Sequence, residues 1–443
     1  MVLVQFSAAG RLTGKGLADA LKAIRRTLNN VLLVGTNASG TEWQLVYPTM
    51  QNGRDVLRRI VLHKEQPRRT VVEQLAKVYL EAPHKGLRAA LDGVYDVEAV
   101  TKRFFAAYRD VFEQVMGLVT GLPDEDERRL FCQTLFNRLM FLCFLQRKGW
   151  LTFDGDQDYL NALWRSYTAT SVAERTGNFY TERLRLLFFT ALNNPRSQDL
   201  SVARDASEAL IGRVPFLNGG LFAEEEVDKR GANVPDEAIG LILRELFARF
   251  NFTISESTPY DVEVAVDPEM LGKVFEELVT GRHESGSYYT PRPIVSFMCR
   301  EGIKGYLATA LLVESPTAVA RFVDEHDSSD IRDPEAALEA LRRVKACDPA
   351  CGSGAYLLGM LHELLDLRAC LFASRSLDAV STYQRKLEII QSNLYGVDLL
   401  WRGSLALRRQ HRYAASVALA GRRLRWRPAA SPAQPRLQGR LRQ

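Results

Sequence analysis

This 443-residue sequence has no long apolar run, no Cys-x-x-Cys pair and no recognisable leader. Its longest compact apolar run, Leu139–Leu145, is far shorter than the roughly 20 residues that a membrane helix needs. The first residues show no basic segment followed by an apolar one, so no secretory signal is predicted. The six cysteines form no Cys-x-x-Cys pair, which disfavours structural zinc. A reduced, cytoplasmic protein with no membrane or metal partner is therefore expected.

Acidic residues are missing from one segment. Residues 401–443 contain 11 arginines and no lysine, aspartate or glutamate, which leaves 47 basic and 53 acidic side chains in the preceding 400 residues. The net charge of +5 therefore comes from the last 43 residues. A basic tail is typical of nucleic-acid binding. A shift of reading frame in the gene would produce the same abrupt change of composition.

The rest of the composition is that of an ordinary globular protein, with 46% apolar and 25% charged residues. Wholly disordered chains and disulfide mini-proteins are thereby excluded. Residues 1–65 are predicted to form a small α/β module of unknown role, and residues 66–280 a helical domain. Strands are predicted over residues 31–34, 43–47 and 56–62, with a helix on Leu17, Leu21, Ile24 and Leu28. Further helices are predicted over residues 71–80, 101–118, 125–148, 237–250 and 267–279.

A different pattern begins at about residue 281. A helix is expected from about Arg292, with prolines at its start, where a missing N–H costs little. A buried strand over 344–347 leads into Asp-Pro-Ala-Cys-Gly-Ser-Gly and then a helix over 355–368. A helix over 381–392 and a strand over 394–398 complete the pattern. This order predicts an α/β fold in which residues 281–400 begin a doubly wound sheet.

Two carboxylates are predicted at the ends of these neighbouring strands. Asp348 ends the first strand and is followed by Gly352 and Gly354, which allow a ligand to approach the backbone. Asp398 ends the second strand, where it could accept hydrogen bonds from a ribose diol. The start of the next helix offers free N–H groups to a polar ligand. The arrangement indicates a nucleoside-cofactor site at the carboxyl edge of a parallel sheet.

Nicotinamide and P-loop sites fit this segment poorly. The dinucleotide fingerprint requires Gly or Ala where this chain has Leu357, and its acid follows about 20 residues on. Asp398 lies 44 residues after Gly354. The Gly-Lys pairs at residues 14–15 and 272–273 are not followed by Ser or Thr, so neither is a P-loop.

Three stretches resemble the amino-methylating DNA methyltransferases. Residues 348–354 are similar to their S-adenosylmethionine motif, residues 286–291 (Gly-Ser-Tyr-Tyr-Thr-Pro) to their Tyr-Thr-Pro motif, and residues 393–398 to their ribose-binding strand. The order of the motifs resembles the adenine-specific, gamma-type enzymes of type II, type IIG-like restriction–modification systems. The resemblance covers about residues 100–400 and includes residues 136–150, 215–222 and 267–272. It implies a largely helical region followed by a Rossmann-like methyltransferase sheet, with double-stranded DNA as the partner.

The resemblance also implies a set of residues that bind S-adenosylmethionine. They are Tyr289, Thr290, Asp348, Gly352, Gly354 and Asp398. The first two would flank the methionine moiety, and the first carboxylate would bind its ammonium group. The glycines would leave room for the methionyl chain, and the last carboxylate would bind the ribose hydroxyls.

The residues that would perform methyl transfer or DNA cleavage are absent from the sequence. The family holds a flipped adenine with Asn-Pro-Pro-Tyr/Phe, and no Asn-Pro-Pro occurs here. No Asp-x-Lys or Glu-x-Lys occurs either, so the usual nuclease pattern is missing. No catalytic residue is therefore assigned, and the chain alone is expected to be inactive.

Two hypotheses account for the tail of residues 401–443. In the first, a frameshift near codons 399–408 truncates the methyltransferase domain before its catalytic motif. In the second, the tail is an Arg-rich arm of a non-enzymatic DNA-binding scaffold or remnant. The composition and the motif order both change at one point, which favours the frameshift.

Overall fold

The computed structural model divides into two compact units. The first contains the described residues up to 290, together with those of 349–355 and residue 397; the second contains residues 292–348 and the described residues of 356–396. The structure describes residues 2–7, 14–24, 31–51, 54–64, 67–193, 208–212, 214–215, 217, 220–253, 261–266, 290, 292–351, 354–371 and 379–397. The predicted helix over 267–279, the Tyr-Thr-Pro loop up to Tyr289 and the tail 401–443 lie outside the described residues.

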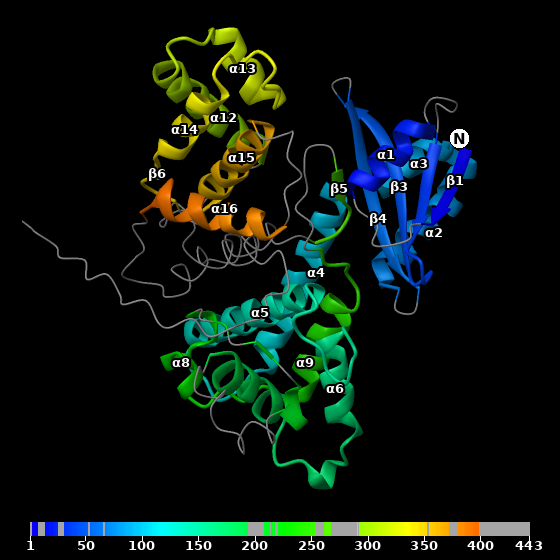
Figure 1. The fold of residues 1–443 in the computed structure, drawn as a ribbon. Helices are drawn as coiled ribbons and strands as arrows, with labels where there is room; N and C mark the ends of the chain where they lie inside the picture. The colour runs from blue at the N-terminus through cyan, green and yellow to red at the C-terminus, as the bar shows by residue number, and fades with distance from the viewer. Residues whose placement is uncertain are drawn as a thin grey trace, which may run out of the picture. The chain divides into compact units, whose positions relative to one another are not determined.

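A five-stranded sheet forms the amino-terminal part of the first unit (Figure 1). Its strands are neighbours in the order β1 to β5; the outer pairs β1–β2 and β4–β5 are parallel, and the inner pairs are antiparallel. The residues 1–65 supply four of these strands, and the fifth comes from far along the chain. The strands are β1 (Val2–Ser7), β2 (Val31–Thr36), β3 (Glu42–Gln51), β4 (Arg54–His63) and β5 (Asp261–Glu263).

Helices cover both faces of this sheet. Successive strand residues point to opposite faces, so Val46 packs with Leu17 and Leu21 of α1 (Gly14–Ile24) on one side. Its neighbour Tyr47 packs on the other side, in a cluster with residues of α2 (Arg69–Lys85) and α3 (Leu87–Val94). The strands predicted over residues 31–34, 43–47 and 56–62 are confirmed within β2, β3 and β4.

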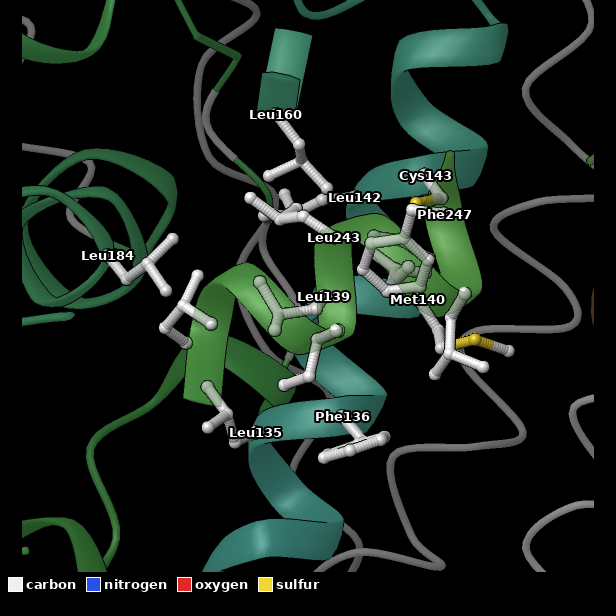
Figure 2. Close-up of a cluster of buried hydrophobic side chains, with 14 of the residues drawn as sticks. Leu135, Phe136, Leu139, Met140, Leu142, Cys143, Leu160, Leu184, Leu243 and Phe247 are labelled. Carbon is white, nitrogen blue, oxygen red and sulfur yellow. The ribbon is translucent and has the colours of Figure 1, made fainter. Parts of the chain in front are cut away.

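A helical region with a large apolar core makes up the rest of the first unit. Its central helix α5 is buried on all sides over most of its length, as expected for a helix without a polar stripe. Figure 2 shows side chains of α5 from Leu135 to Cys143 meeting Leu243 and Phe247. The elements are α4 (Val97–Leu118), α5 (Glu125–Arg147), α6 (Tyr159–Ala169), η1 (Val172–Glu174), η2 (Tyr180–Leu184), η3 (Leu186–Leu192), η5 (Gly220–Phe222), α8 (Glu226–Lys229), α9 (Asp236–Ile242) and η6 (Leu243–Phe247).

Aspartates begin the two longest helices of this region. Asp96 accepts from the backbone N–H groups of residues 98 and 99, and Asp124 does the same for residues 126 and 127. Such N-caps satisfy donors that have no partner within the helix. The helices predicted over 101–118 and 125–148 are confirmed as α4 and α5. The helix predicted over 237–250 is an α-helix that continues as the π-helical η6.

The second unit is a cluster of helices with two short parallel strands whose residues are half-buried or exposed (Figure 1). Its core joins residues of all five helices, including Phe322, Leu341, Leu364 and Ile389. The strand, helix, helix and strand order predicted for residues 344–398 is confirmed. The first strand, predicted as buried over 344–347, lies instead at Ala346–Asp348 and is half-buried or exposed. The elements are α12 (Arg292–Ala310), α13 (Pro316–Glu325), α14 (Pro334–Arg343), β6 (Ala346–Asp348), α15 (Ala355–Leu371), α16 (Ala379–Ser392) and β7 (Leu394–Gly396).

The described residues are therefore mixed α/β, mostly helical, with two small sheets. The two strands β6 and β7 are parallel, as the start of a doubly wound sheet requires. A complete Rossmann-like sheet over 281–400 remains a prediction.

Candidate functional site

Asp348 is the last residue of β6, at the carboxyl end of a parallel strand. It is paired in register with Gly396 of β7, and its side chain is half-buried. Open parallel sheets bind their ligands beyond this end of the strands. The structure thus places the first predicted carboxylate where a cofactor site is expected.

The chain turns sharply after this strand. The backbone N–H of Cys351 donates to the carbonyl oxygen of Val397 at 2.9 Å, and that of Gly354 donates to the carbonyl oxygen of Cys351 at 2.7 Å. Gly354 has φ +83°, in the left-handed region that side chains disfavour, and α15 begins at the next residue. Glycine is therefore required at 354 by the backbone itself, whichever ligand the turn meets.

The remaining predicted site residues are described only in part. Thr290 is half-buried. Tyr289, Gly352 and Asp398 lie outside the described residues, so the predicted set is not seen assembled. Among the predicted residues, the structure places Asp348 and Gly354 at the two ends of one short strand-to-helix segment.

Helix α15, which follows the turn, is packed tightly against α12. A methyl group on Gly359 would lie 2.3 Å from Cγ1 of Val295 and 3.4 Å from Sγ of Cys299, so the two helices meet where no side chain intervenes. The sequence shows Gly359 only as a glycine in the middle of a helix. Its packing role becomes visible with the partner helix in place.

One turn further along α15, Glu363 is the centre of a buried polar cluster. Its carboxylate accepts from Ser296 Oγ at 2.8 Å and Arg300 Nε at 2.9 Å, and lies 3.1 Å from Nε2 of His326. Burial alone would raise the pKa of Glu363, but the hydrogen bond from His326 and the charge of Arg300 outweigh it and lower that pKa. The cluster joins α12, α15 and the end of α13 by charge-assisted hydrogen bonds.

Asn393, just before β7, holds the two strands together. Its side chain is fully buried, and Nδ2 lies 2.7 Å from the carbonyl oxygen of Val344, with the carbonyls of Leu341 and Arg342 at 3.3 and 3.1 Å. Its Oδ1 accepts from Arg368 at 3.0 Å. The sequence indicated Asn393 only as the first residue of a strand motif, and an asparagine before a strand carries no signal of such a set of contacts.

A buried ion pair joins α8 to the central helix α5. Arg138 of α5 and Asp228 of α8 form two hydrogen bonds of 2.7 Å, and both side chains are almost completely buried. Arg138 also donates to the carbonyl oxygens of Leu221 and Ala223. Its role is to hold the segment after residue 220 against the central helix, and nothing in the spacing of the sequence pairs Arg138 with Asp228.

Among the described residues there is no cluster of three or more His, Cys, Asp or Glu side chains that could hold a metal ion. Within the same residues, no helix is both long and apolar enough to cross a membrane.

Comparisons with known proteins now give the chain a context. No protein-family model matches it. It is 30% identical, over 304 residues, to a protein of Methanocaldococcus jannaschii whose name describes it as a type II restriction enzyme and methyltransferase. The alignment covers 62% of this chain and 24% of that relative, so the chain spans about a quarter of the length of the curated protein it matches.

A solved structure also matches, at a much lower level. The type IIL restriction–modification enzyme MmeI, in complex with DNA, is 16% identical with a TM-score of 0.39, covering 73% of this chain and 36% of that one. Values this low establish neither a shared fold nor a shared activity.

Proposed function

We propose that this chain supplies the S-adenosylmethionine-binding part of an adenine-N6 DNA methyltransferase from a type II restriction–modification system. One observation carries the proposal. Asp348 lies at the carboxyl end of a strand that is parallel to β7, and the chain then turns through Gly354 in a left-handed conformation into α15. That is the arrangement in which a doubly wound sheet binds a nucleoside cofactor.

The similarity to a restriction enzyme and methyltransferase supports the same class of function. Adenine as the target, the gamma order of the motifs and double-stranded DNA as the partner rest on the resemblance of residues 286–291, 348–354 and 393–398. These three points are part of the proposal.

The residues at the turn fit the cofactor chemically. Asp348 is half-buried as a residue, and its carboxylate would bind the ammonium group of the methionine moiety by a charge-assisted hydrogen bond. The absence of a side chain at Gly354 leaves the backbone open to the methionyl chain. Thr290 would flank the same moiety, and Tyr289, Gly352 and Asp398 complete the proposed set. When bound, S-adenosylmethionine supplies the methyl group on its sulfonium.

Methyl transfer itself needs groups that hold a flipped base, and the sequence has no Asn-Pro-Pro for this purpose. We therefore propose that the chain binds the cofactor but does not methylate DNA alone. Turnover of S-adenosylmethionine on duplex DNA by the purified chain would refute this part.

Cofactor binding can be tested by isothermal titration calorimetry with S-adenosylmethionine. Asp348→Asn removes the charge at the strand end and should weaken binding at least tenfold. Glu335→Gln removes a charge from an exposed position on α14 and is the matched control, which should bind like the unsubstituted chain. Equal binding by all three proteins would remove Asp348 from the site, and no binding by any would refute the proposed cofactor.

The basic tail favours a second candidate, a DNA-binding scaffold. Eleven arginines without an acid in residues 401–443 would neutralise phosphates and release counterions. DNA binding that weakens steeply with salt and disappears on deletion of 401–443 would support it. Loss of cofactor binding in Asp348→Asn, with DNA binding intact, would separate the two functions.

A further inference from the structure

The main chain of Asn393 makes the first contact between the two parallel strands. Its carbonyl oxygen accepts from the N–H of Ala346 at 2.8 Å, and its own N–H donates to Ile389 of α16 at 2.8 Å. The two strands then pair in register, from Ala346 with Leu394 to Asp348 with Gly396. The residue therefore lies at the point from which the pairing of β6 with β7 begins.

The side chain of Asn393 binds the segment that leads into the other strand. Its amide nitrogen faces the carbonyl oxygens of Leu341, Arg342 and Val344, and its oxygen faces Arg368, which also donates to Leu341 at 2.8 Å. Only a carboxamide offers two N–H donors and an acceptor at these places. An aspartate would present an oxygen to three carbonyl oxygens, which repel it.

We propose that Asn393 is a positioning residue for the cofactor: it sets the register of β7 on β6, and through it the position of Asp348 beside Gly396 at the end of the paired strands. This inference rests on the proposed function. A shift of the pairing by one residue moves a strand by about 3.3 Å and turns its side chains to the opposite face. A carboxylate that binds a ligand from the end of β6, as proposed for Asp348, cannot tolerate such a shift.

The binding test compares two substitutions in the second unit. Asn393→Ala removes the side-chain contacts of Asn393, and Leu364→Ala removes part of the core at a fully buried position on α15, outside both strands. Calorimetry with S-adenosylmethionine is done on the full chain, well below the melting temperature of each variant. The expected result is at least tenfold weaker binding for Asn393→Ala and unchanged binding for Leu364→Ala. Equal effects in both variants would overturn the positioning role, because the loss would then follow stability alone.

A second measurement reads the register without the cofactor. Cys347 is exposed and pairs in register with Tyr395, so Tyr395→Cys should form an oxidative cross-link with it. Adding Asn393→Ala should lower the yield of this cross-link at least threefold, and adding Leu364→Ala should not. An unchanged yield with Asn393→Ala would overturn the inference.

The two measurements keep the inference distinct from the proposed function. If the unsubstituted chain does not bind S-adenosylmethionine, the proposed cofactor is wrong, while the cross-link still decides whether Asn393 sets the register. If Asn393→Ala does not fold, Asn393→Ser, which keeps one hydrogen-bond donor at this position, is measured instead. Failure of both variants to fold would overturn a positioning role and make Asn393 a residue of overall stability.

Discussion

Substitution of Gly359 by alanine tests the close packing of α15 on α12. Two effects oppose each other. Replacing a helical glycine by alanine normally stabilises a helix by about 0.5–1 kcal/mol. The new methyl group, however, would lie 2.3 Å from Cγ1 of Val295, which real contacts do not permit, and overpacking of a core costs about 1–3 kcal/mol.

We therefore expect Gly359→Ala to lower the free energy of unfolding by about 0.5–2 kcal/mol. Gly302→Ala and Gly305→Ala, on the exposed side of α12, are matched controls because a methyl group there meets nothing within 4 Å. They should raise the free energy of unfolding by about 0.5–1 kcal/mol. The measurement is urea unfolding followed by circular dichroism, together with hydrogen exchange of the amides of α15.

A double substitution locates the effect. Val295→Ala alone should cost about 1.5 kcal/mol, at about 0.8 kcal/mol for each buried carbon removed. With Val295→Ala in place, the methyl group of Gly359→Ala has room. The double variant should therefore lose less free energy of unfolding than the sum of the losses in the two single variants. The reasoning is refuted if Gly359→Ala is stabilised like the two controls, or if the two losses simply add.

Three further predictions concern stability. Arg138→Ala should lower the free energy of unfolding in urea by about 3–5 kcal/mol, because it leaves the buried Asp228 carboxylate without its ion-pair partner. Arg138→Met combined with Asp228→Leu should recover part of that loss, and equal losses in the two variants would contradict this prediction. Gly354→Ala should cost about 1–2 kcal/mol, because alanine is strained at φ +83°; a stabilised variant would show that the turn adopts another conformation. The pKa of Glu363 is lowered in the folded chain, so its contribution is present above the ordinary carboxyl pKa and is lost as the pH falls through the folded value. The melting temperature of the unsubstituted chain should therefore converge with that of Glu363→Gln as the pH falls below the ordinary carboxyl pKa, and a constant difference would contradict this.

Much of the secondary structure could be predicted because apolar periodicity follows local geometry. Helix α4 carries this periodicity, whereas the inner strands β2 to β4 and the long helix α5 are marked by apolar runs bounded by turn residues, and the length of the run separates strand from helix. Strand β5 could not be predicted, since three residues are too few for an alternation to be read. The sequence predicts one helix over residues 237–250. The change from the α-helix α9 to the π-helical η6 within it has no signature in the sequence.

The candidate site could be predicted in its local part only. A carboxylate at a strand end and a glycine in a turn are local features, so Asp348 and Gly354 lie where the motif indicated. The contacts of Asn393, Glu363 and Arg138 join segments far apart in the chain, and no local pattern records such a pairing. These residues become recognisable only when their partners are known.

The parallel pairing of β5 with β4 has a consequence for folding during synthesis on the ribosome. Strand β4 can pair with β5 only after the whole helical region has been synthesised, because β5 begins at Asp261. Until then a strand with unsatisfied backbone groups is exposed in the nascent chain, which is a known hazard for aggregation. Addition of β5 to the first sheet is therefore a late step of folding during synthesis. The helical region is the connection between β4 and β5.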